Sequence, residues 1–205
     1  WGIEQKITTV DASTFQTYLT NLKPLFVEMV RGAEMVLFNR CEDIKPLAGY
    51  RRSVKVVSPQ AEVIFEDEQG EVENIFEDDV PYDLDAPVIE IPREDYGIWY
   101  VDMMDNPDRY DGVTVRYKAV MCHSKKFKGV HCPGRFAMVC CNNDMQFLAL
   151  VCKGQELEKF KNRQWVEITA TVKKEANDAY QGEGPVLYVT AIAPCEKPKE
   201  EVVSF

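Results

Sequence analysis

The stretch QWVEITATVKK, Gln164–Lys174, alternates polar and apolar side chains along most of its length. Successive side chains of a β-strand point to opposite faces, so this alternation predicts a strand with one buried face. We expect an aliphatic set to face the core, namely Val166, Ile168 and Ala170. On the other side Trp165 precedes Glu167 and Thr169, and we expect Trp165 to cover one end of the domain and to be at least partly buried.

Four further runs in this part of the chain are also typical of β-strands: Gly112–His123, Gly134–Cys141, Met145–Cys152 and Gly184–Pro194. A short helical piece, Gly154–Asn162, separates the third run from Gln164–Lys174. Three strands, a helix and two more strands follow the order of an OB barrel. The sequence therefore predicts an OB-like five-stranded barrel over residues 110–194, preceded by a helix within Arg93–Tyr110 that stops near Asn106-Pro107.

The first part of the chain has a different pattern. Apolar residues recur at spacings of three and four over Asp11–Cys41, which predicts one helix, or two if Pro24 interrupts it. Asp11 or Ser13 can cap its start. Ser53–Asp79 then predicts strands around the turn Glu68-Gln69-Gly70. The fold class is thus α+β, with a helical and acidic β-hairpin segment over 1–87 and an OB-like domain over 88–205.

The net charge of −10 is unevenly distributed. Residues 1–87 carry 8 basic and 17 acidic side chains, and residues 88–205 carry 16 and 17. Binding to a nucleic-acid backbone normally needs a basic face. Because neither part of the chain has an excess of basic residues, we expect no nucleic-acid partner. An OB module that binds single strands through the loop Lys125-Lys126-Phe127-Lys128 is kept as an alternative function.

Both histidines and four of the seven cysteines lie within Met121–Cys141. If the first two strands pair around the intervening loop, Cys122 falls opposite Cys132 and His123 opposite His131. A regular ladder then places the cysteines on one face and the histidines on the other, so the four cannot share one tetrahedral metal ion without a bulge. A metal site that uses some of them, a Cys122–Cys132 disulfide and unlinked thiols all remain open.

Cys140 and Cys141 are subject to the same alternation. One thiol faces the core as a small apolar group, and the other can join Asp144 if Asn142 and Asn143 form a turn. Arg135 in the same stretch either orients a carboxylate or anion or is a solvated strand arginine. The candidate ligands favour zinc or copper over calcium or magnesium, with zinc the expected ion. They are Cys122, His123, His131, Cys132, Cys140, Cys141 and Asp144.

Several of these motifs together resemble the bacterial YcgQ-type family. The matching segments are DNPDRYDGVTV (105–115), GRFAMVCCNNDM (134–145), QWVEITATV (164–172), GPVLYVTAI (184–192) and PKEEVVSF (198–205). The family's carboxyl-terminal domain opens on Asn-Pro-Asp-Lys-Tyr-x-Gly and continues with an arginine upstream of Cys-Cys-x-x-Asp. The resemblance covers residues 88–205 and carries over Arg135, Cys140, Cys141 and Asp144. The segment 1–87 and the two Cys–His couples depart from the family's pattern.

The resemblance implies a non-enzymatic accessory or substrate-handling domain of a membrane transport system, with a permease subunit as its partner. It also implies membrane association through a segment absent from this chain, and an extracytoplasmic domain. The residues themselves leave a thiol-based enzyme as a further alternative. They name no third group to orient a Cys–His pair. The transported species and the oligomeric state do not follow from the sequence.

Overall fold

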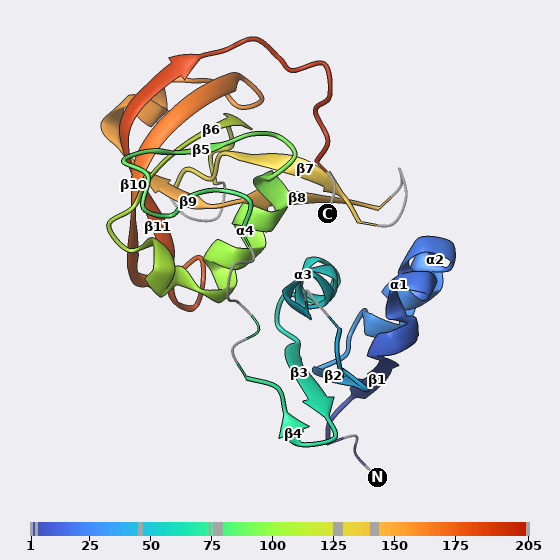
Figure 1. Ribbon diagram of the computed structural model, residues 1–205. Coiled ribbons are helices and arrows are strands. Elements are labelled where there is room, and N and C mark those ends of the chain that lie inside the picture. The colour runs from blue at the N-terminus through green and yellow to red at the C-terminus, as the bar shows by residue number, and fades with distance from the viewer. Residues whose placement is uncertain are drawn as a thin grey trace. The chain divides into compact units, whose positions relative to one another are not determined.

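The structure of the protein is a computed structural model, and it describes residues 2, 4–44, 47–73, 75, 80–124, 129–139 and 144–203. The chain forms two compact units (Figure 1). The first comprises residues 1–79 with 139–144, and the second comprises 80–138 with 145–205. No helix in the described ranges is both long and apolar enough to cross a membrane.

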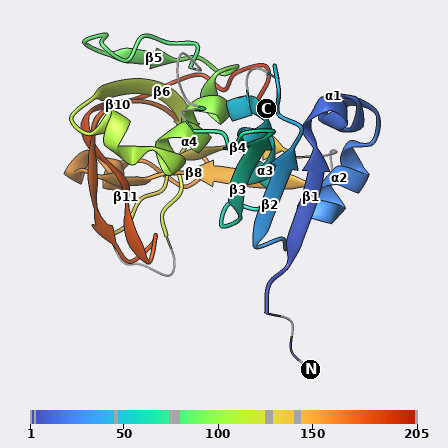
Figure 2. The same ribbon diagram turned by 60° about the horizontal axis from the view of Figure 1, so that its bottom comes forward.

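The first unit has helices packed on a small, mostly parallel sheet. Its elements in chain order are β1 (Ile7–Asp11), α1 (Ala12–Asn21), α2 (Lys23–Val30), β2 (Met35–Asn39), α3 (Leu47–Val57), β3 (Glu62–Asp67) and β4 (Gly70–Glu71). The strands lie in the order β1-β2-β3-β4, with the first three parallel and β4 antiparallel to β3. Figure 2 shows β1, β2 and β3 side by side. The core is aromatic: Phe15, Phe26, Phe38 and Phe65 are all buried.

Three predictions for this unit are confirmed. The Asp11 side chain caps α1 by accepting a hydrogen bond from the Ser13 N–H. The helical run is interrupted next to Pro24, which stands in the first turn of α2, where the missing N–H of proline is tolerated. The turn Glu68-Gln69-Gly70 likewise joins β3 to β4.

Two other predictions are wrong. Helix does not continue to Cys41, because Gly32 adopts φ +100° after α2 and Met35–Asn39 is strand β2. Ser53–Val57, predicted as strand, is the end of α3. Parallel strands need a crossover connection, and the helix α3 supplies it between β2 and β3. Tertiary packing therefore overrides the β-propensity of the local Ser-Val-Lys-Val-Val sequence.

The second unit is an OB-like barrel. Its elements are β5 (Ile89–Ile91), α4 (Tyr96–Asp105), the 3-10 helix η1 (Pro107–Tyr110), β6 (Thr114–Val120), β7 (Gly134–Met138), β8 (Met145–Ala149), β9 (Val151–Lys153), the 3-10 helix η2 (Gln155–Lys159), β10 (Trp165–Asn177) and β11 (Gly182–Pro194). The sheet order is β8-β7-β6-β10-β11-β9, and β5 pairs with β6. β9 runs parallel to β11, which nearly closes the barrel as in an OB fold (Figure 1).

The predicted strand order is confirmed, with one refinement. The third run is split at Leu150 into β8 and β9, so one bent segment pairs with β7 at one end and β11 at the other. In β10 the aliphatic set is fully buried, as predicted, and Trp165 is 7% exposed. The short helical piece is the 3-10 helix η2, and α4 ends at Asp105 directly before Asn106.

Candidate functional site

The couples predicted from residue numbers are present in the hairpin that follows β6. His123 and His131 form an antiparallel bridge. On either side of it the Cys132 N–H donates to the Cys122 carbonyl at 2.8 Å and the Ser124 N–H donates to the Val130 carbonyl at 2.9 Å. The histidines therefore occupy a non-hydrogen-bonded position, where opposed side chains lie closest.

The two imidazole rings converge on each other. Their Nδ1 atoms are 2.7 Å apart, and His123 Nε2 lies 2.7 Å from the carbonyl oxygen of Phe160. Because a carbonyl only accepts, His123 Nε2 carries the proton, and its Nδ1 then accepts from the Nδ1–H of His131. The His123 N–H also donates to Asn162 Oδ1 at 2.7 Å, and the His131 carbonyl accepts from the Cys152 N–H. Both histidines are thus held in place by neighbouring segments.

Burial favours the neutral form of His131. His131 is 7% exposed, and burial, with a smaller contribution from the adjacent His123, lowers its pKa below the ordinary value. Histidine binds metal ions in its neutral form, so this shift favours a ligating role for His131.

The two hairpin cysteines, and Cys152 on β9, are thiols in the structure. Cys122, Cys132 and Cys152 are free, and burial, then the neighbouring Cys122, raises the pKa of Cys132 to about 11. Burial likewise raises the pKa of Cys152 to about 12, against the lowering effect of a hydrogen bond with Tyr117. A thiol with such a pKa is protonated at neutral pH and is a weak nucleophile.

The remaining predicted ligands are not gathered at this pair. Within the described ranges no group of three or more His, Cys, Asp and Glu side chains is placed to hold a metal ion. Asp144 belongs to the first unit, where it accepts a hydrogen bond from Arg31 Nη2 at 2.8 Å. Cys140 and Cys141, and with them the predicted approach of one thiol to Asp144, lie outside the described residues.

Arg135 is buried rather than solvated, with 3% exposure. Its guanidinium lies over the rings of Trp165 and Tyr96, with its carbon 5.3 and 5.9 Å from their centroids. Arg135 Nη2 donates to the carbonyls of Glu200 and Glu201 at 3.1 and 3.4 Å, while Nε has no described partner. Its observed partners are therefore main-chain carbonyls of the C-terminal segment, and burial lowers its pKa.

Sequence reasoning missed the groups that orient the histidines. Phe160 acts through its carbonyl, so its side chain gives no signal, and Asn162 is one of several asparagines in loops. It also missed the buried cluster around Asp102, whose carboxylate accepts hydrogen bonds from Asn106, Arg109 and Tyr110. The short segment Asn106–Tyr110 could have indicated that cluster, because it contains all three hydrogen-bond donors to Asp102.

We expect stability to fall as the pH drops from about 6.5, the ordinary histidine pKa of an unfolded chain. His131 has a lowered pKa in the folded protein, so the unfolded chain binds the proton more tightly. Its contribution is complete above the unfolded pKa and is lost as the pH falls through the folded one. Urea unfolding at pH 7.5 and 5.5 should show a larger loss for the wild type than for His131→Gln. Equal losses would contradict the prediction.

Comparison with known proteins gives one family. Residues 68–203 match the DUF1980 C-terminal domain. No curated protein matches the chain.

Similar solved structures include the OBody AM3L15 bound to hen egg-white lysozyme, at 13% identity, a TM-score of 0.32 and coverage of 50% of this chain and 90% of that one. They also include the OBody NL8 bound to hen egg-white lysozyme, at 10% identity, a TM-score of 0.28 and coverage of 43% and 100%. A third is aspartyl tRNA synthetase from Entamoeba histolytica, at 15% identity, a TM-score of 0.26 and coverage of 43% and 20%. At these TM-scores the likenesses add nothing to the fold, which rests on the strand order.

Proposed function

The chain belongs to the DUF1980 C-terminal domain family, and from this premise we propose that it is a non-enzymatic accessory domain of a membrane transport system that binds zinc through His123 and His131. The observation that carries the metal proposal is the convergence of two imidazoles, with Nδ1 atoms 2.7 Å apart. The transport role rests on the resemblance to YcgQ-type proteins, whose predicted partner is a permease subunit.

The surroundings of the histidines support a metal site. A ligating histidine usually donates its second ring N–H to a carbonyl or carboxylate, which fixes the ring orientation. His123 makes that contact with the Phe160 carbonyl. Two nitrogens bound to one tetrahedral zinc ion at 2.0–2.1 Å lie about 3.3 Å apart, so the rings need to separate by roughly 0.6 Å. Zinc binding would require the proton on His131 Nδ1 to move to Nε2 of the same ring, which frees both Nδ1 lone pairs for the ion.

Transport would follow from this chemistry in a simple way. A site with two protein imidazoles leaves coordination positions for water or for a ligand of a partner, as in sites that keep an open position. Such a site suits an accessory domain that holds an ion and passes it on. The raised pKa values of Cys132 and Cys152 argue against a thiol nucleophile and so favour a non-enzymatic role.

One observation favours the nucleic-acid alternative. Phe136 on β7 is 45% exposed and its ring lies 4.9 Å from that of Phe147 on β8, and OB folds often bind oligonucleotides on these two strands. The near-neutral charge of residues 88–205 opposes it. The same apolar pair, together with the exposed Met145, equally suits contact with the permease subunit.

Zinc titration against a chromophoric chelator tests the metal proposal. We expect one zinc ion per wild-type chain, and an affinity at least about 10-fold lower in both His123→Gln and His131→Gln because each removes one ligand. Cys195→Ser, a free cysteine outside the hairpin, is the matched control and should bind as the wild type does. Unchanged binding in the double His variant, or loss only on Cys140→Ser and Cys141→Ser, would overturn the assignment to the histidines.

Two further measurements test the role of the domain. We expect no sub-micromolar binding of a short single-stranded oligonucleotide at about 150 mM salt, measured by fluorescence anisotropy. We also expect co-purification with the permease that the resemblance predicts beside its gene, weakened by Phe136→Ser. Tight oligonucleotide binding that is lost on Phe136→Ser would favour the alternative instead.

A further inference from the structure

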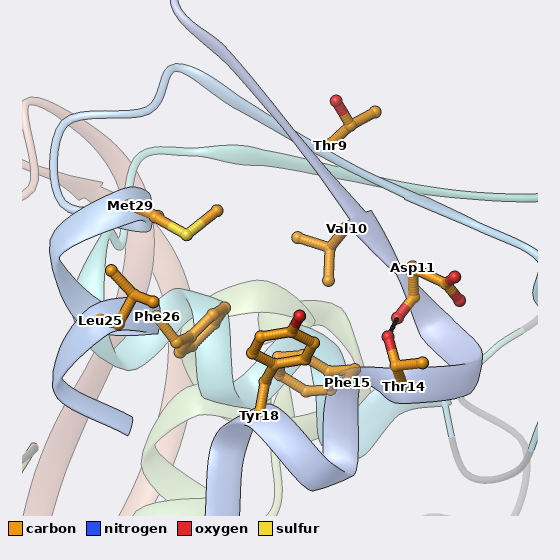
Figure 3. Close-up of a pocket in the computed structure, with 9 residues that line it drawn as sticks. All are labelled: Thr9, Val10, Asp11, Thr14, Phe15, Tyr18, Leu25, Phe26 and Met29. Carbon is orange, nitrogen blue, oxygen red and sulfur yellow. Dashed lines mark hydrogen bonds between the residues drawn. The ribbon is translucent and has the colours of Figure 1, made fainter. Parts of the chain in front are cut away.

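Two features of the molecule are not used by the proposed function, and the first is an apolar cavity of about 530 Å³ between β1, α1 and α2 (Figure 3). The charged residue among those that line it is Asp11. Its carboxylate already accepts hydrogen bonds from the Ser13 N–H at 3.0 Å and from Arg40 Nη1 at 2.7 Å. The lining of the cavity therefore offers no free charge that selects a ligand.

The second feature is the cysteine couple of the hairpin that follows β6. Cys122 and Cys132 directly flank the His123–His131 bridge, and the Cys132 N–H donates to the Cys122 carbonyl at 2.8 Å. The two cysteines are therefore opposed across the ladder. Neighbouring side chains on a strand point to opposite faces, so the thiols lie on the face of the hairpin away from the imidazoles.

The backbone spacing at this couple suits a disulfide. Opposed residues joined by a ladder hydrogen bond have Cα atoms about 5.5 Å apart. Disulfides usually join Cα atoms 4.4–6.8 Å apart, most often near 5.5–6 Å. The strands therefore need not move apart or together for the two sulfur atoms to bond.

The two thiols are also accessible, in contrast to the third cysteine nearby. Cys122 and Cys132 are both free and half-buried, so a small reagent can reach them. Cys152 is fully buried, and its sulfur lies 3.4 Å from the Tyr117 hydroxyl in the barrel core. Cys122 is therefore the partner that the fold offers to Cys132.

We propose that Cys122 and Cys132 form a reversible redox pair, which closes to a disulfide by exchange with a small-molecule disulfide such as oxidised glutathione. The pair makes the hairpin responsive to the thiol–disulfide balance around it. It lies on the other face of the hairpin from the histidines, so the proposal does not depend on zinc binding.

The exchange takes two steps. The thiolate of Cys122 attacks one sulfur of the reagent, whose S–S bond breaks and releases one thiol, leaving a mixed disulfide on the protein. Cys132 then attacks the Cys122 sulfur and releases the second thiol. Two protein thiols are oxidised, the reagent is reduced to two thiols, and these take up the two protons. Burial keeps Cys132 protonated at neutral pH, so Cys122 attacks first, and proximity assists the second, intramolecular step.

Peptide mapping of the full chain tests the pairing. The protein is incubated with oxidised glutathione at pH 8, its remaining thiols are alkylated, and it is digested with trypsin without reduction. Ala119–Lys125 and Gly129–Arg135 are then separate peptides with one cysteine each. We expect them to appear joined, with a mass equal to their sum less two hydrogen atoms, and to separate on reduction.

Matched variants identify the bond. Cys122→Ser and Cys132→Ser should each abolish the joined peptide. Cys195→Ser removes another free, half-buried cysteine that lies outside the hairpin, and should leave the joined peptide unchanged. The proposal fails if the wild type ends with glutathione on either hairpin cysteine, if both thiols stay free, or if either is joined to a different cysteine.

Urea unfolding shows whether the folded hairpin accommodates the bond. A crosslink restricts the unfolded chain, so we expect the oxidised wild type to unfold at a higher urea concentration than the reduced protein. Cys122→Ser should have the same midpoint under both conditions. An unchanged or lower midpoint for the oxidised wild type would mean that the bond distorts the hairpin, and would overturn the proposal.

Discussion

Replacing Trp99 with alanine is expected to lower the free energy of unfolding of the second unit by about 3–5 kcal/mol. Trp99 lies on α4, is fully buried and packs against Tyr96 and Tyr117, with ring centroids 5.2 and 4.9 Å away. Its removal would leave a cavity between the helix and β6, because the surrounding strands are held by ladder hydrogen bonds and relax only partly. The barrel depends on this helix for much of its core.

Urea unfolding followed by Trp165 fluorescence measures the effect, since Trp165 remains in the variant and lies on β10 of the same unit. Trp99→Phe is the graded control. It keeps an aromatic ring in the core and removes the indole Nε1–H, which has no hydrogen-bond partner among the described residues. We expect it to cost clearly less than alanine. A loss below about 1 kcal/mol for Trp99→Ala would mean that α4 is not integral to the barrel core.

The Asp102→Ala variant is expected to cost about 3 kcal/mol, near the lower end of the range for breaking a buried charged pair, because Arg109 is partly solvated. Asp102 is 4% exposed on α4, and its carboxylate accepts from Arg109 Nη1 at 3.0 Å and from the Tyr110 hydroxyl at 2.5 Å. The Tyr110 hydroxyl is also 2.7 Å from that of Tyr82. Without the carboxylate these donors lose their acceptor in a largely buried position.

Asp108→Ala is the matched control for this prediction. Asp108 lies in the same segment, is exposed and pairs with Lys174 on the surface, so its loss should cost less than about 1 kcal/mol. The same urea experiment compares the two variants. Similar costs for both would show that burial does not distinguish them. The expected difference would show that the Asn106–Tyr110 segment stabilises the position of α4 on the barrel through Asp102, and that it is not a binding motif.

Much of the barrel follows from the sequence because its strands are half-buried. Val166, Ile168 and Ala170 lie on one face of β10, and a similar alternation marks most of β6. The first unit was less predictable. There the strands β2 and β3 lie between neighbours in a parallel sheet, and the choice between helix and strand for Met35–Asn39 and Ser53–Val57 was made by packing.

The candidate site divides in the same way. Register arithmetic places His123 opposite His131, since a two-stranded ladder has one pairing for a given turn centre. It cannot supply the Phe160 carbonyl, which comes from a segment 37 residues further along the chain. Nor can it predict that Arg135 is buried against Trp165, because a strand arginine is ordinarily solvated and only the returning C-terminal segment covers it.

By itself, the sequence determined the OB-like order of strands and the end of α4 before Asn106. It also determined that Cys122 lies opposite Cys132 and His123 opposite His131. Each of these depends on local periodicity or on proline and turn chemistry. Tertiary structure alone decided which imidazole nitrogens converge, which carboxylate is buried at Asp102, and where α1 and α2 leave a cavity beside β1. These features join residues that are distant in the chain or depend on how side chains fill space. Local pattern carries no information about either.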